Sequence, residues 1–297
     1  MYFFSLLKLK FLKIVSLCRP NPIISHRRLR RLQIDIANQS FQLKKNIDKF
    51  FRISLPEHEL RLYNELITHS QSQCRQDVII ALICDRNPGL IVEVGATDGI
   101  LLSNSLMLEQ ILDWECVLVE PCRAWKQKLI LNRSDSKLVF DAVSHSSNLT
   151  LNFTETEYPE LSGISVCLPD DFWSAERRNC VTYDVNSTTL DSICNEYSID
   201  GRFLVVTIDI EGGEVDALRG FTENIMLANL LVIENNGSLN KIDSLDKILL
   251  NLNFVRLIWP FDSFDSWYLR EDYLTGCSIL TYLLQNSALK TIPSICY

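Results

Sequence analysis

The sequence lacks the residue spacings that zinc sites and dinucleotide-binding loops require. Its ten cysteines and four histidines are scattered over 297 residues and include no Cys-x-x-Cys pair, so no zinc-ligand spacing is present. We expect the thiols to serve mostly as small core hydrophobes in a reducing compartment. No Gly-x-Gly-x-x-Gly segment occurs, and its absence disfavours a nicotinamide-dependent oxidoreductase.

Long uncharged apolar runs are also missing. The first 18 residues are apolar but contain Lys8, Lys10 and Lys13, which leaves them too short and too charged for a comfortable membrane span. They also lack the residue order and the cleavage site of a signal peptide. We expect a helix that packs on the body of the protein or a poorly ordered leader, with an interfacial helix on anionic lipid as the alternative.

Positive charge is scarce outside the N-terminus. The chain carries 29 Lys and Arg against 37 Asp and Glu, a formal net charge of −8. Residues 1–52 hold 12 of these basic and two of these acidic residues, giving +10 and leaving −18 on the rest. This acidic body disfavours nucleic acid as a partner. We expect a cytoplasmic protein, and the basic arm permits peripheral contact with a membrane.

Composition and the pattern of apolar residues divide the chain into four segments. We expect a basic N-terminal arm, a helical lead-in, a main domain and a C-terminal extension, covering residues 1–52, 53–89, 90–275 and 276–297. The apolar fraction of 47% and charged fraction of 22% are those of an ordinary globular protein. Neither composition nor length predicts an oligomeric state.

From residue 90 onward, short apolar runs alternate with helical patterns. Five runs are typical of buried parallel strands followed by helices; they cover residues 90–94, 116–119, 137–143, 203–208 and 230–233. The runs 254–259 and 265–270 are so close that they favour an antiparallel hairpin. The pattern predicts an α/β fold: a Rossmann-like doubly wound sheet, mostly parallel with one antiparallel strand, and a helical N-terminal extension. Residues 144–188 look less regular.

Such a sheet binds its ligand at the carboxyl ends of its strands, and the first predicted strand ends in an acidic, glycine-containing turn. Glu93 precedes Gly95, Asp98 and Gly99 in this turn. Glycines permit close approach of a ligand to the backbone, and a nearby acid favours a cationic ligand such as a sulfonium or ammonium group. A tight turn without a ligand is the alternative.

The next two predicted strands also end near acids. Glu120 follows the second, where a carboxylate can accept hydrogen bonds from both hydroxyls of a ribose, and this supports an adenosine-containing cofactor. Asp141 lies near the end of the third, where it could accept a hydrogen bond from an exocyclic amine or remain a solvated acid.

Three carboxylates, Asp209, Glu211 and Glu214, follow the fourth predicted strand. Their mutual repulsion calls for a compensating cation or substrate. They could orient hydroxyls or contain a general base, and Asp209 and Glu211 are candidate ligands of a divalent cation. Alternatively, Glu214 faces a helix dipole and Asp209 is a structural cap. Glu234 adds an acid after the fifth strand.

Four segments carry a resemblance to a known family; in order, they are EVGATDG, VEP, TTLDSI and TIDIEGGEVDALRGF. Over roughly residues 90–260, the chain resembles the FkbM family of S-adenosylmethionine-dependent methyltransferases. The resemblance implies a class I methyltransferase fold, S-adenosylmethionine as cofactor, and methyl transfer to a hydroxyl of a sugar, glycan or secondary metabolite. Glu93 and Thr97 replace an Asp and an Asn of the usual family pattern. A non-catalytic scaffold that docks to a membrane or partner through its basic arm is the alternative.

The resemblance also implies roles for individual residues. Glu93, Gly95 and Gly99 would line the methionine half of the cofactor. Glu120 would bind the ribose and Asp141 the adenine edge. The acids of the DIEGGE segment, at residues 209–214, would face the small-molecule or glycan acceptor.

Overall fold

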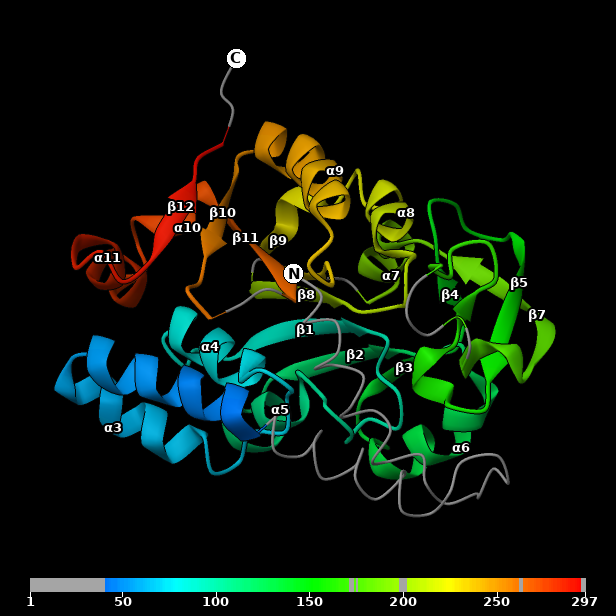
Figure 1. Ribbon diagram of the computed structural model, residues 1–297, viewed down its shortest axis with the longest axis horizontal. Coiled ribbons are helices and arrows are strands. Elements are labelled where there is room, and N and C mark those ends of the chain that lie inside the picture. The colour runs from blue at the N-terminus through cyan, green and yellow to red at the C-terminus, as the bar shows by residue number, and fades with distance from the viewer. Residues whose placement is uncertain (1–40, 171–173, 175, 198–201, 262–263, 295–297) are drawn as a thin grey trace.

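Figure 1 shows the computed structural model of the protein, which describes residues 41–170, 174, 176–197, 202–261 and 264–294. Its centre is an eight-stranded sheet in which five neighbouring strands are parallel. These five strands are β1 (Gly89–Val94), β2 (Glu115–Val119), β3 (Lys137–Val139), β8 (Phe203–Ile208) and β9 (Ala228–Glu234). In space they follow the order β3-β2-β1-β8-β9. This order confirms the predicted doubly wound fold and puts a topological switch point between β1 and β8.

Three strands complete this sheet beyond β9. They are β10 (Phe254–Ile258), β11 (Asp265–Arg270) and β12 (Lys290–Ile292). Strand β11 lies between β9 and β10 and is antiparallel to both, as expected for the hairpin. The short β12 pairs antiparallel with β10 and adds a second reversed strand, at the edge, that the sequence did not predict.

Helices cover both faces of the sheet, as Figure 1 shows. One face carries α3 (Glu57–Leu66), α4 (Gln76–Ile83), α5 (Leu106–Leu112), α6 (Arg123–Asn132) and α11 (Ser278–Gln285). The other carries α7 (Leu190–Glu196), α8 (Glu214–Arg219) and α9 (Leu239–Leu249). The remaining helical pieces are short: α10 (Glu271–Leu274), η1 (Pro159–Leu161), η2 (Glu176–Arg178), η3 (Ile225–Leu227) and η4 (Leu250–Leu252).

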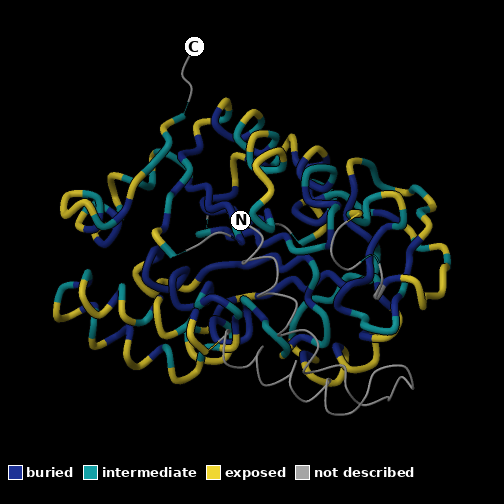
Figure 2. The backbone as a smooth tube through the Cα atoms, viewed as in Figure 1, coloured by how far each residue is buried: buried dark blue, intermediate teal, exposed yellow. Residues whose placement is uncertain are grey.

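Burial on both faces explains why the parallel strands read as continuous apolar runs. Every residue of β1 is buried. Ile91 packs into the core beneath α4, whereas Leu90 and Val92 pack into the core beneath α7 and α9. Figure 2 shows the same pattern, with buried strands inside and exposed segments on the outer helical surfaces.

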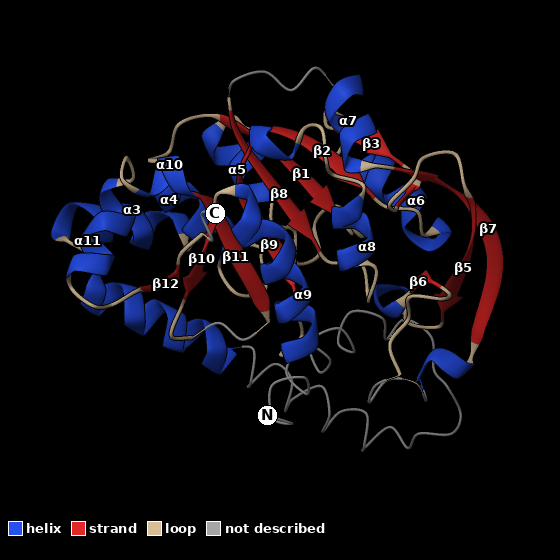
Figure 3. Cartoon of the chain, turned by 90° about the horizontal axis from the view of Figure 1, so that it is seen from above, coloured by secondary structure: helices blue, strands red, loops and turns tan. Residues whose placement is uncertain are grey.

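A second sheet occupies the region that the sequence presented as irregular. Its order is β4-β7-β5-β6, and its strands are β4 (Ala142–Val143), β5 (Thr150–Thr156), β6 (Gly163–Ile164) and β7 (Cys180–Thr188). The expected third strand over 137–143 was therefore wrong in part: β3 ends at Val139, and β4 pairs with β7 instead. Figure 3 shows β5 and β7 at one end of the molecule, beside the main sheet.

Residues 41–54, at the end of the predicted basic arm, form a helix that joins the body of the protein. Leu43, Ile47 and Phe51 recur at helical spacing and are buried in the core shared with α3 and α4. The expectations for the first 18 residues lie outside the described residues. Within the part of the chain that the structure describes, no helix has the length and apolar character needed to span a bilayer.

The described cysteines fit their expected role in part. All eight are free thiols, and five of them are buried: Cys74, Cys84, Cys116, Cys122 and Cys194. Burial raises the pKa of the Cys84, Cys116, Cys122 and Cys194 thiols. Cys180 is exposed on β7.

Candidate active site

A cleft with two lobes lies at the carboxyl ends of β1 and β8. The lobes share six lining residues: Val94, Gly95, Thr97, Glu160, Asp209 and Glu211. Lobe A extends toward β2, β4 and the second sheet and is also lined by Glu120, Pro121, Ala142, Val143, Phe153, Pro159, Ser162, Gly163, Ile164 and Ile210. Lobe B extends toward α5 and is also lined by Glu93, Leu101, Leu102, Asn104 and Thr207. The cleft therefore has the position that the doubly wound fold predicts for a ligand.

Gly95 lets the ends of β1 and β8 meet beneath the cleft. Its φ of +93° is unfavourable for other residues, and a Cβ atom there would lie 2.0 Å from the carbonyl oxygen of Asp209. The Gly95 amide donates to the Val119 carbonyl at 2.9 Å, and the Asp209 amide donates to the Val94 carbonyl at 3.0 Å. The glycine is thus required by backbone packing as well as by its place in the cleft lining.

Glu93 organises the turn that borders lobe B. Its buried carboxylate accepts hydrogen bonds from the hydroxyls of Ser103 and Ser105, at 2.9 and 2.5 Å, and from the Asn104 amide at 2.7 Å. Burial raises the pKa of Glu93, while these hydrogen bonds and the nearby Arg133 guanidinium oppose the rise. Glu93 also lines lobe B, and its predicted contact with the methionine half of the cofactor stays a prediction.

Glu120 lines lobe A, as its predicted contact with a ribose requires. Its two carboxylate oxygens accept hydrogen bonds from the backbone amides of Thr97 and Cys122, each at 2.9 Å. Burial raises the pKa of Glu120 to about 7, with further upward contributions from Asp209 and Glu155. Because a carboxylate has about four acceptor sites, Glu120 retains capacity for ligand hydroxyls.

Asp98, Gly99 and Asp141 are not among the residues that line the two lobes. Asp98 accepts hydrogen bonds from the backbone amides of Ile100 and Leu101, at 3.0 and 2.7 Å, and so shapes the turn after β1. Asp141 lies between β3 and β4, and its neighbours Ala142 and Val143 contribute to lobe A. Their predicted contacts with a cofactor stay predictions.

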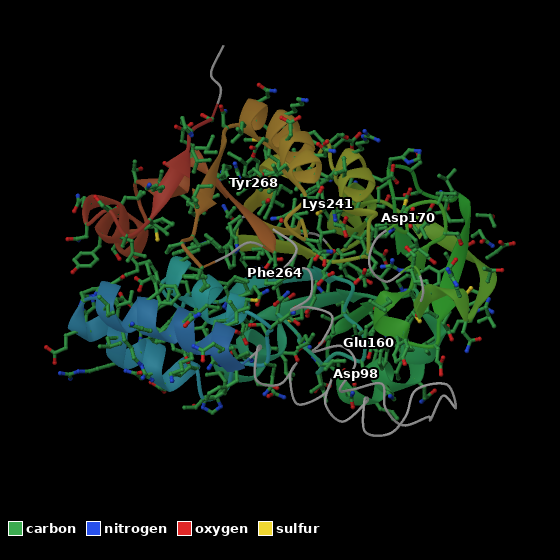
Figure 4. The ribbon with its side chains drawn as sticks, viewed as in Figure 1. Asp98, Glu160, Asp170, Lys241, Phe264 and Tyr268 are labelled. Carbon is green, nitrogen blue, oxygen red and sulfur yellow. The ribbon has the colours of Figure 1, made fainter. Side chains whose placement is uncertain are left out.

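The structure separates the three acids of the DIEGGE segment. Asp209 and Glu211 line both lobes. Glu214 is fully buried and outside the lining of both lobes; it accepts hydrogen bonds from the amides of Ile210 and Gly212 and pairs with Lys241 at 2.7 Å. Lys241 is labelled on α9 in Figure 4. Glu214 thus stabilises the turn that carries the other two acids.

Protein cations compensate part of the repulsion that the sequence predicts here. The guanidinium Nη2 of Arg177 lies 3.2 Å from Glu211 Oε2, and both side chains are buried. Lys241 Nζ lies 2.7 Å from Glu214 and 3.9 Å from Glu234. Carboxylate oxygens of Asp209, Glu211 and Glu234 lie within 4.8 Å of one another, a separation that is compatible with the predicted cation.

Sequence reasoning missed Glu160, which belongs to η1 in the connection from β5 to β6. It lines both lobes, and its carboxylate oxygens are buried without a hydrogen bond from any other described residue. Burial raises the pKa of Glu160 to about 7; Asp98 and Glu211 add to the rise and Lys128 opposes it. In the sequence this residue is one acid within a segment without clear periodicity, so only the fold reveals its position.

Two more polar groups were missed in lobe B. Asn104 Oδ1 and Thr207 Oγ1 are buried, and neither has a hydrogen-bond partner among the described residues. Buried polar atoms normally find partners. A ligand that brings hydrogen-bond donors into lobe B would satisfy both.

The sheet order is that of a Rossmann-like fold of the class I methyltransferase type, with an acid-lined cleft at the switch point. The family model of the methyltransferase FkbM domain matches residues 93–256, more than half of the chain, and the protein belongs to this family. Membership implies a methyltransferase that uses S-adenosylmethionine, which agrees with the resemblance seen in the sequence. It also disfavours a nicotinamide-dependent enzyme.

The chain is similar to a crystal structure of a methyltransferase FkbM from Methylobacillus flagellatus KT, with 17% sequence identity and a TM-score of 0.40. The match covers 61% of this chain and 43% of that chain, so it spans less than half of the other protein. No curated protein matches this sequence significantly.

The chemistry of the cleft fits S-adenosylmethionine, which carries a sulfonium and an ammonium group. Its lining combines carboxylates with the acceptor atoms Asn104 Oδ1 and Thr207 Oγ1. Such an acidic lining suits a cationic ligand.

Proposed function

We propose that this protein is an O-methyltransferase that acts on a hydroxyl of a sugar, a glycan or a secondary metabolite. The observation that carries the proposal is the two-lobed cleft, whose junction is lined by the carboxylates of Glu160, Asp209 and Glu211. Carboxylates accept hydrogen bonds from hydroxyl groups and can also take up their protons as bases. The same negative charge disfavours an acceptor that is itself anionic.

Lobe A suits the adenosine part of the cofactor. Glu120 would accept hydrogen bonds from the ribose hydroxyls, and Ala142 and Val143 would border the adenine. Asp141, next to them in the chain, would contact the adenine edge only after a side-chain rearrangement, since it is outside the lining. This assignment follows the sequence prediction for Glu120.

Lobe B suits the methionine part. Asn104 Oδ1 and Thr207 Oγ1 would accept hydrogen bonds from the ammonium group, and Glu93 holds the turn that presents Asn104. When bound, S-adenosylmethionine supplies a methyl group on a positively charged sulfur. Glu120 in lobe A and Asn104 and Thr207 in lobe B would hold the cofactor, with the acceptor bound at the junction of the lobes, and proximity would supply most of the rate.

We assign Asp209 to the acceptor hydroxyl, as hydrogen-bond acceptor and base. It lines both lobes, whereas Glu214 lies outside them and serves the turn. Glu211 is oriented by Arg177 and contributes negative charge at the same place. Only Asp209 and Glu211 of the three predicted catalytic acids therefore keep a proposed role at the acceptor.

A divalent cation at Asp209 and Glu211 stays a prediction of the sequence. Because Arg177 and Lys241 already neutralise neighbouring acids, we propose methyl transfer without a metal. Activity that is unchanged after treatment with a chelator supports this choice, and activity that is lost and then restored by Mg²⁺ contradicts it.

The proposed reaction can be tested with S-adenosylmethionine that carries a labelled methyl group. The purified chain is incubated with a panel of neutral glycosides, polyols and phenols, and products are separated by mass. A methyl ether on a hydroxyl supports the proposal, and Asp209→Asn should abolish it. Label found only on nitrogen or carbon of an acceptor would contradict O-methylation.

We also propose that the basic arm contacts anionic membranes peripherally. In the helix over residues 41–54, Lys45, Lys49 and Arg52 are exposed. The side chains of Phe41 and Ile53 are 69% and 74% exposed. Basic residues beside exposed apolar ones suit binding at a lipid headgroup surface.

A further inference from the structure

The shared lining of the two lobes marks the place where the halves of the cofactor join. In S-adenosylmethionine, the sulfur atom connects the adenosyl group to the methionine chain. If lobe A holds the first and lobe B the second, the sulfur lies beside the residues common to both lobes. The charged residues of this set are Glu160, Asp209 and Glu211.

Glu160 differs from the other two in where it comes from. Asp209 and Glu211 follow β8 of the main sheet, whereas Glu160 lies on η1, between β5 and β6 of the second sheet. It therefore reaches the cleft from the second sheet and not from a strand end of the main sheet. Figure 4 shows Glu160 above Asp98, on the side of the molecule where α6 lies.

Glu160 also lacks the partners that the other buried acids of the cleft have. Arg177 pairs with Glu211, three groups donate hydrogen bonds to Glu93, and two amides donate to Glu120. Among the described residues, none donates to the carboxylate of Glu160 other than its own backbone, although the residue is only 7% exposed. Burial of a carboxylate without partners is costly, and such a cost is typical of groups that await a ligand.

We propose that Glu160 recognises the positive charge on the sulfur of the bound cofactor and so distinguishes S-adenosylmethionine from S-adenosylhomocysteine. This inference rests on the proposed function, because it uses the cofactor placement given there. Methyl transfer leaves the electron pair of the broken S–C bond on sulfur, and the product sulfur is neutral. Glu160 then loses its electrostatic partner, which weakens product binding relative to cofactor binding.

The ionisation of Glu160 gives a second consequence. Its pKa is raised to about 7 by burial; Lys128 on α6 lowers it, and Asp98 after β1 and Glu211 after β8 raise it. A nearby cation favours the ionised carboxylate and lowers its pKa. Binding of S-adenosylmethionine at pH 7 should therefore release protons from Glu160, and the neutral-sulfur product should release fewer.

Calorimetric titration separates these effects. We would measure the dissociation constants of S-adenosylmethionine, S-adenosylhomocysteine and sinefungin, whose ammonium group replaces the sulfonium, for the parent chain and for Glu160→Gln. The substitution should reduce the preference for the two charged ligands over S-adenosylhomocysteine by about tenfold, the order expected for one close charge pair in a partly hydrated cleft. The affinity for S-adenosylhomocysteine should change less than about twofold.

Glu157→Gln is the matched control. Glu157 precedes Glu160 by three residues and accepts a hydrogen bond from Asn179 at 3.1 Å, and it lines neither lobe. This variant should leave the ligand preference unchanged, which excludes a general effect of net charge. Thermal unfolding of each variant checks that it is folded.

The outcomes distinguish this inference from the proposed function. An unchanged preference in Glu160→Gln, or an equal loss for all three ligands, overturns the role of Glu160 while cofactor binding itself stands. Failure of the parent chain to bind any of the three contradicts the proposed function and, with it, this inference. Titrations of the parent chain in two buffers with different ionisation enthalpies measure the number of protons released on binding, and they need no variant. Equal proton release on binding S-adenosylmethionine and S-adenosylhomocysteine also overturns the role of Glu160.

Discussion

Arg177 and Glu211 form a buried ion pair that joins the two walls of the cleft, with 3.2 Å between Nη2 and Oε2. Arg177 comes from η2, next to the second sheet, whereas Glu211 follows β8 of the main sheet. The guanidinium also donates to the carbonyls of Leu161 and Pro169, at 3.3 and 3.0 Å. One side chain thus fixes the connection that carries Glu160 against the acids of the main sheet.

This pair gives the first prediction. Arg177→Met leaves Glu211 buried without its cationic partner and should lower the free energy of unfolding by about 3–5 kcal/mol. The double variant Arg177→Met with Glu211→Gln should recover a large part of this loss, because it removes the uncompensated charge. Urea unfolding of the three proteins measures both effects. Equal stability of the single and double variants would show that the charge of Glu211 is not the cause.

The second prediction concerns Glu214. Its carboxylate holds the amides of Ile210 and Gly212 and pairs with Lys241. Glu214→Gln should lower the free energy of unfolding by about 2–4 kcal/mol, since it breaks a fully buried pair, and should leave the affinity of the folded protein for S-adenosylhomocysteine within about threefold. Chemical unfolding and calorimetry test these two statements. A stable variant with abolished methyl transfer would restore Glu214 as a catalytic acid.

The third prediction uses the raised pKa values of Glu120 and Glu160, both about 7. The pKa of each carboxyl group in the folded protein lies above its ordinary value of 4.5. Between these two pKa values, the folded state therefore binds more protons than the unfolded state. The two groups make their full contribution to the free energy of unfolding below pH 4.5, and this contribution is lost as the pH rises through 7. The protein without ligand should lose about 1–3 kcal/mol per group over this range.

Glu160→Gln provides the control for this pH dependence. Glutamine cannot ionise, so the variant should show a smaller loss of stability from pH 5 to pH 8 and should melt above the parent at pH 8. Melting temperatures of both proteins across this range give the comparison. Parallel curves for parent and variant would mean that Glu160 has an ordinary pKa.

The fourth prediction concerns Gly95. An alanine Cβ would lie 2.0 Å from the Asp209 carbonyl oxygen, at a φ of +93°. Gly95→Ala should cost about 1–3 kcal/mol from backbone strain alone and should displace Asp209 from the cleft. Gly276→Ala is the control, because the nearest atom to its added Cβ is 3.8 Å away. Similar melting temperatures for the two variants would contradict the contact between β1 and β8.

The fifth prediction tests the proposed membrane contact. Charge reversal of Lys45, Lys49 and Arg52 to glutamate should abolish sedimentation with phosphatidylserine vesicles at low salt, and neutral phosphatidylcholine vesicles should bind neither protein. Deletion of residues 1–52 is a poorer test, because Leu43, Ile47 and Phe51 are buried in the core. Equal sedimentation of the parent and the charge-reversed variant would remove the proposal.

The sequence predicted the main sheet well for a physical reason. Strands such as β1 are buried on both faces, so they appear as apolar runs between turns. Strand β7 was missed because its alternating residues Val181, Tyr183 and Val185 are exposed or half-buried and form no continuous apolar run. The split of the expected strand at Val139 depends on the pairing of β4 with β7, which no local pattern encodes.

The cleft was predictable only in part for the same reason. Glu120 and Asp209 line it because strand ends in a parallel sheet meet at one edge, a rule that operates on sequence order. The pairing of Glu214 with Lys241 spans 27 residues and depends on how α9 packs. Glu160 reaches the cleft from the second sheet, so its importance emerges only from the tertiary structure.

The most direct test of the central claim is calorimetric titration of the purified chain with S-adenosylhomocysteine, alongside Glu120→Ala. The account predicts micromolar binding by the parent chain and at least about tenfold weaker binding by the variant, since Glu120 lines lobe A and accepts the ribose hydroxyls. No binding by the parent chain, or equal binding by a folded Glu120→Ala variant, would contradict it.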